Sequence, residues 1–134
     1  MHRASLLLLC CFTTAAYAQS AVYIVVQHSG LSGFRYYDGP RVWDDLTVGD
    51  PITLVREQTN PHDPGAVRVE WRGHMIGYVP QRENRHLARQ LDHGVRFTGR
   101  ITALDRARNG RNRVSYEIFV PLQAAPFPAT GGDR

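Results

Sequence analysis

Six short runs rich in β-branched and aromatic residues, most of them bounded by glycine, proline or asparagine turns, limit what this chain can fold into. Such runs are typical of β-strands, and Ala66–Trp71 alternates apolar with charged residues as a strand with one buried face does. The expected strands are 22–27, 51–57, 66–71, 75–79, 95–104 and 114–120.

One helix is expected among these strands. Leu87, Ala88 and Leu91 recur at helical spacing within 82–92, and Gly94 stands where a helix commonly ends. Six strands and one short α-helix predict a mainly β fold, a small OB-like or SH3-like β-barrel of the kind that binds ligands on one face.

The first 18 residues have the pattern of a signal peptide. A short basic start precedes the apolar run Leu6–Phe12, and the small-residue site Ala16-Tyr17-Ala18 predicts cleavage after Ala18. The apolar run is too short to span a bilayer, and no later stretch is longer. A lipoprotein anchored through Cys10 or Cys11 and a misplaced start codon are the weaker alternatives. We therefore expect a secreted or periplasmic protein with a domain over 22–122 and a flexible tail over 123–134.

Cysteine and charge content narrow the function further. Both cysteines lie in the expected leader, so the cleaved chain has no thiol for catalysis, for zinc or for a disulfide. All 16 basic residues are arginine, and loss of Arg3 leaves 15 arginines against 12 acidic residues, a charge of +3. Arginine grips phosphate with two hydrogen bonds, which suits nucleic acid, but genomic base composition explains the same bias.

Four motifs in order resemble the HIRAN family, and the likeness extends over residues 22 to 120. They are Gly33–Gly39 (GFRYYDG), Leu54–Glu57 (LVRE), Asn60–Val67 (NPHDPGAV) and Gly73–Pro80 (GHMIGYVP). The resemblance implies a compact β-barrel domain, often attached to chromatin-remodelling-type helicases, that captures the 3′ end of single-stranded DNA.

The resemblance also implies which residues meet DNA. An Arg-Tyr pair after the first strand corresponds to Arg35 and Tyr36, where the guanidinium holds a phosphate and the ring stacks on a terminal base. On a regular strand Tyr36 and Tyr37 point to opposite faces, so one of them packs inward, and packing in the barrel is the alternative role for Tyr36.

The Asn-Pro-x-Asp turn supplies two further candidates. Asp63 matches the family residue that accepts a hydrogen bond from the terminal hydroxyl, and His62 stands where the family has a stacking tyrosine. Aspartate in such a turn also bonds its own backbone, so both roles stay open for Asp63.

Two family phosphate cations are missing, because Tyr78 and Gln81 occupy the positions of a histidine and a lysine. Arginines elsewhere can compensate or can be merely solvated. They are Arg82, Arg85 and Arg89 on the helix and Arg106, Arg108, Arg111 and Arg113 in the last hairpin.

An enzyme is not expected. The chain has no nucleophile and base at motif spacing and no phosphate-binding lysine, its histidines lack metal-ligand spacing, and no cofactor is indicated. The leading hypothesis is a monomeric, non-catalytic module that recognises single-stranded DNA 3′ ends. The alternative is an extracytoplasmic adaptor that binds a protein partner in the same groove.

Overall fold

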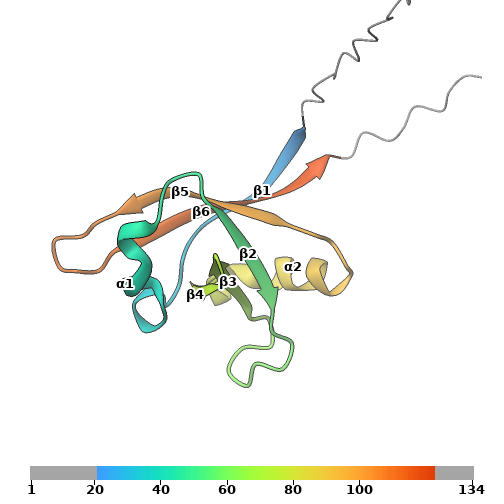
Figure 1. Ribbon diagram of the computed structural model, residues 1–134. Coiled ribbons are helices and arrows are strands. Elements are labelled where there is room, and N and C mark those ends of the chain that lie inside the picture. Colours follow the sequence, from blue (N-terminus) through green and yellow to red (C-terminus); the bar gives the residue numbers. More distant parts are fainter. Residues whose placement is uncertain (1–20, 123–134) are drawn as a thin grey trace, which may run out of the picture.

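The computed structural model describes residues 21–122, which form one six-stranded antiparallel sheet in the order β1-β6-β5-β2-β3-β4 (Figure 1). The predicted leader (1–18) and tail (123–134) lie outside these residues. The strands are β1 (Val22–Gly30), β2 (Pro51–Arg56), β3 (Val67–Trp71), β4 (His74–Tyr78), β5 (Thr98–Asp105) and β6 (Arg113–Leu122).

The prediction of a mainly β fold with six strands is confirmed, but the sheet is not closed into a barrel. The chain after β1 pairs with β4 through an isolated bridge and not through a strand: Ser32 and Tyr78 exchange two backbone hydrogen bonds of 2.9 Å. Gly77, at φ 150°, permits this approach, because a Cβ there would lie 2.5 Å from the Ser32 carbonyl oxygen.

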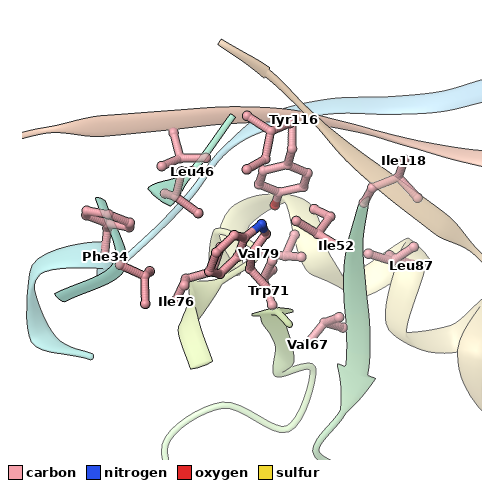
Figure 2. Close-up of a cluster of buried hydrophobic side chains, with 14 of the residues drawn as sticks. Phe34, Leu46, Ile52, Val67, Trp71, Ile76, Val79, Leu87, Tyr116 and Ile118 are labelled. Atoms are coloured by element: carbon pink, nitrogen blue, oxygen red, sulfur yellow. The ribbon is translucent and has the colours of Figure 1, made fainter. Parts of the chain in front are cut away.

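The core is formed by the curved sheet, by apolar residues of the segment 34–46 and by the helix α2 (Gln81–Asp92), which is the helix that the sequence predicts. Strand β3 shows why the alternation was informative, because Val67, Val69 and Trp71 are buried while the residues between them are half-buried. Figure 2 shows Trp71 among the buried aliphatic side chains. Its indole nitrogen donates to Asp50 at 2.8 Å, so the one polar atom of the ring is satisfied.

Phe34–Tyr37 does not form the regular strand that would place Tyr36 and Tyr37 on opposite faces. Gly33 takes a left-handed conformation (φ 76°), and Phe34–Tyr36 forms a 3₁₀ turn, η1. Phe34 turns inward against Trp43, whereas Tyr36 and Tyr37 are both exposed. The sequence analysis also missed two single-turn elements that follow η1. They are α1 (Gly39–Val42) and the 3₁₀ turn η2 (Trp43–Asp45).

Within residues 21–122, no helix is both long and apolar enough to cross a membrane.

Candidate functional site

A pocket of about 260 Å³ opens where β4 passes into α2, beside the Asn-Pro-x-Asp turn. Four of the six residues singled out from the sequence line it together, although they come from separate parts of the chain. These four are His62, Asp63, Tyr78 and Gln81, and Ser32, Tyr37, Asn60, Ala66 and Val79 complete the lining.

Asn60 holds the turn that carries two of these residues. Its side-chain oxygen accepts hydrogen bonds from the backbone nitrogens of His62 (2.9 Å) and Asp63 (3.1 Å), and its amide donates to Glu57 at 3.0 Å. An asparagine that bonds the backbone after it is a standard way to fix a tight turn. Asn60 therefore sets the position of the exposed His62 ring at the mouth of the pocket.

Asp63 is held by bonds within the domain. One carboxylate oxygen accepts from the Gly65 backbone nitrogen at 2.9 Å, and the other accepts from the buried Asn84 amide at 2.7 Å. Gly65 is required here, because a Cβ would lie 2.7 Å from the Asn84 oxygen. These contacts establish the turn-forming role of Asp63. An ionised carboxylate has about four acceptor sites, so the carboxylate still has capacity for a ligand.

Two tyrosines form the aromatic wall of the pocket. The rings of Tyr37 and Tyr78 meet edge to face, with centroids 5.6 Å apart. The Tyr78 hydroxyl donates to Glu57 at 2.9 Å. Burial, and then this bond, raise the pKa of Tyr78 to about 12, so its hydroxyl keeps its proton at neutral pH.

Glu57 is the shared acceptor beneath this wall. Its pKa is lowered, chiefly by the hydrogen bond from Asn60 and further by Tyr78 and Arg68, against the opposing effect of burial. The Arg68 guanidinium lies 3.0 Å from the Glu57 carboxylate. Glu57 therefore stays ionised and ties the turn, β3 and β4 together under the pocket.

Arg35 and Tyr36, the other two predicted residues, do not line the pocket. The Arg35 guanidinium lies over the Tyr36 ring at 4.5 Å from its centroid and hydrogen-bonds its hydroxyl. The Tyr36 side chain is 69% exposed. An aromatic residue that sequence reasoning did not single out is Tyr37, which belongs to the same motif but follows the Arg-Tyr pair from which the candidates were taken.

A second hollow of about 320 Å³ adjoins the pocket, with which it shares Asp63 and Gln81. Arg56, Arg85 and Arg89 line it. Arg56 is committed to the fold, because it pairs with Asp92 at 3.0 Å and donates to two backbone carbonyls. Arg85 and Arg89 are exposed, so they offer their guanidinium groups to solvent next to the pocket.

The other arginines considered from the sequence are placed elsewhere. Arg82 pairs with its neighbour Glu83 at 3.0 Å, and Arg106 pairs with Asp44 at 2.9 Å. Arg108, Arg111 and Arg113 are exposed at or beside the connection between β5 and β6. None of these side chains lines the pocket.

The fold and the pocket define a class of small β-sheet domain with an aromatic and polar recess that is flanked by arginines. Within residues 21–122, no group of three or more His, Cys, Asp or Glu residues could hold a metal ion. The HIRAN domain family model matches residues 24–123. The chain therefore belongs to the HIRAN family.

Two solved structures are similar to the chain. A crystal structure of a protein from Lactobacillus plantarum matches with a TM-score of 0.62 and 25% identity, covering 75% of this chain and 98% of that one. The crystal structure of the HIRAN domain of human HLTF matches with a TM-score of 0.59 and 20% identity, covering 74% of this chain and 77% of that one. A search of curated proteins gave no match.

Proposed function

We propose that the chain is a non-catalytic nucleic-acid-binding module that holds the 3′ end of a single strand in the pocket between Tyr37, His62, Tyr78 and Gln81. The observation that carries the proposal is the convergence of these side chains, from separate segments, on one recess of about 260 Å³ beside exposed arginines. Membership of the HIRAN family supports nucleic acid as the ligand class.

In this proposal the terminal base stacks on Tyr37, which is exposed and already braced edge-on by Tyr78. Stacking on an aromatic face tolerates any base and contributes roughly 1–3 kcal/mol for each base. His62 borders the same recess, and the unused acceptor sites of Asp63 face the terminal hydroxyl. This division of roles needs no sequence-specific contact.

The phosphates next to the terminal base would contact Arg85 and Arg89 in the adjoining hollow, which shares Gln81 with the pocket. These two arginines supply the positive charge that Tyr78 and Gln81 do not. Each guanidinium that neutralises a phosphate releases condensed counterions, so binding weakens as salt rises. Arg35, whose guanidinium lies over the exposed Tyr36 ring, is a further candidate for a contact with the DNA backbone.

Fluorescence anisotropy of the full chain with short single-stranded DNA tests the proposal. We expect binding that weakens steeply between low and moderate salt and that prefers a free 3′ hydroxyl to a 3′ phosphate. Tyr37→Ala should weaken binding by roughly 5- to 150-fold, the loss of one stacked base, while Tyr37→Phe should bind like the original chain.

Arg85→Ala and Arg96→Ala form a matched pair, because both arginines are exposed but only Arg85 lines the hollow beside the pocket. Arg85→Ala should weaken binding and reduce its salt dependence, and Arg96→Ala should do neither. No binding at low salt, or equal effects of the two changes, would overturn the proposal and favour a protein partner in the same groove.

A further inference from the structure

The free edge of β1 is bare and apolar. Five consecutive residues, Val22 to Val26, are each 42–56% exposed, and none is charged. They lie in the part of β1 that, with the end of β6, projects beyond the rest of the sheet (Figure 1). On one side β1 pairs with β6, and no strand within residues 21–122 pairs with its other side.

The opposite edge of the sheet is treated differently. Strand β4 is covered by the backbone of Ser32, which bonds Tyr78 in both directions, and by η1 beyond it. Natural proteins protect free edges with charges, prolines, bulges or covering segments, because an unpaired row of backbone groups is a template for another strand. Residues Val22–Val25 have none of these protections, and a bulge at Val26, between Val25 and Gln27, follows them.

Side chains beside this edge extend the apolar surface. Tyr23 is half-exposed and packs edge to face on Phe119, with centroids 5.0 Å apart, and Leu122 at the end of β6 is 53% exposed. Val26 also lines a mainly apolar hollow of about 270 Å³ with Leu87 and Phe97. Apolar side chains therefore adjoin both ends of the segment Val22–Val26.

We propose that this edge is a homodimer interface, in which β1 pairs antiparallel with β1 of a second copy. The sequence of the edge suits itself. With Ile24 on the two-fold axis, Tyr23 lies opposite Val25, and Val22 lies opposite the bulge residue Val26, so every cross-strand pair is β-branched or aromatic and no like charges meet. A two-fold axis also closes the assembly, since each edge is used once.

The dimer pairs the free backbone N–H and C=O groups of β1 and removes its exposed apolar side chains from water. It replaces the expectation of a monomer. It leaves the pocket free, because Tyr37, His62 and Gln81 do not belong to β1 or β6. The assembly would join two sheets into one and carry two pockets.

Sedimentation velocity of the full chain, from about 1 to about 200 µM, tests the proposal in the range where small interfaces dissociate. We expect a concentration-dependent dimer. Ile24→Lys should weaken it by more than about 30-fold, because two isoleucine side chains stay in water and two ammonium groups face each other. Val48→Lys is the matched control, since Val48 is 56% exposed but lies between η2 and β2.

Hydrogen exchange of the same samples locates the contact. Backbone amides of Val22–Val26 should become protected as the dimer forms, and circular dichroism should show that Ile24→Lys keeps the fold. A monomer at all concentrations, or a dimer that Ile24→Lys and Val48→Lys weaken equally, would overturn the proposal. Protection of these amides in a monomer would also overturn it, because another segment of the same chain would then cover the edge.

Discussion

Replacing Asn60 by alanine should loosen the turn that forms one wall of the pocket. The change deletes three hydrogen bonds, of 2.9, 3.0 and 3.1 Å, two to the backbone of the turn and one to Glu57. A typical internal hydrogen bond contributes about 1 kcal/mol net, so the free energy of unfolding should fall by roughly 2–4 kcal/mol. For a domain of this size that loss lowers Tm by roughly 10–20 °C.

Urea unfolding followed by tryptophan fluorescence measures this loss, with Asn109→Ala as the matched control. Asn109 accepts one hydrogen bond, from the backbone nitrogen of Arg111 at 3.1 Å, in an exposed turn. We expect Asn109→Ala to cost less than about 1 kcal/mol. If Asn60→Ala costs no more than this control, the bonds of Asn60 do not hold the turn, and the account of how His62 is positioned is wrong.

Three other predictions follow from the described contacts and from the sequence. Glu57→Gln should destabilise the chain by about 1–2 kcal/mol at pH 7, because Asn60, Arg68 and Tyr78 then donate to a neutral amide instead of a carboxylate. The lowered pKa of Glu57 contributes stability above about pH 4.5 that is lost as pH falls through that pKa. The difference in free energy of unfolding between the original chain and Glu57→Gln should therefore narrow in acid. A constant difference down to about pH 3 would refute this. Gly77→Ala should lower the free energy of unfolding by more than about 2 kcal/mol, because of the φ of 150° and the clash with the Ser32 carbonyl. Gly30→Ala, with open space around it, should lower it far less. Similar losses in thermal melts of the two variants would contradict the packing argument. Mass spectrometry of the protein exported by a bacterial host should give a chain that begins at Gln19, and an intact leader would argue against the predicted cleavage.

The sequence predicted those elements in which local pattern and burial agree. In β3 the inward positions are valine and tryptophan at every second residue, and in α2 Leu87 and Ala88 recur at helical spacing and are buried. Gly94 ends that helix as expected, with a left-handed φ of 84°. In each of these segments the apolar residues recur either at the two-residue spacing of a strand or at the spacing of a helix, and not at both. The local sequence is therefore enough to predict the element.

Other features depend on contacts between distant segments. The turn η1 and the short α1 are single turns too short for any periodicity, and they are positioned by Phe34 packing on Trp43 and by Asp38 bonding the Met75 carbonyl. The sheet stays open because the segment after β1 forms only one bridge with β4, between Ser32 and Tyr78, and continues as short helical turns instead of a strand. Neither fact can be read from one segment alone.

The sequence predicted part of the candidate site. Resemblance to the family brought together His62, Asp63, Tyr78 and Gln81, which do share a pocket. Tyr36, chosen from the Arg-Tyr pair of the family, stays a prediction, and Tyr37 was not singled out although a 3₁₀ turn after Gly33 leaves both tyrosines exposed and places Tyr37 in the pocket. The bonds that Asp63 makes with Gly65 and Asn84 were foreseen only as one of two possibilities.

The measurement that tests the central claim most directly is a ¹H–¹⁵N NMR titration of the full chain with a short single-stranded DNA that has a free 3′ hydroxyl. The account predicts the largest shifts at residues 60–66 and 78–81 and at Tyr37, with smaller ones on the outer face of α2. Shifts confined to the arginine-rich turn at 106–113, or none at all, would contradict it, because the pocket would then not be where nucleic acid binds.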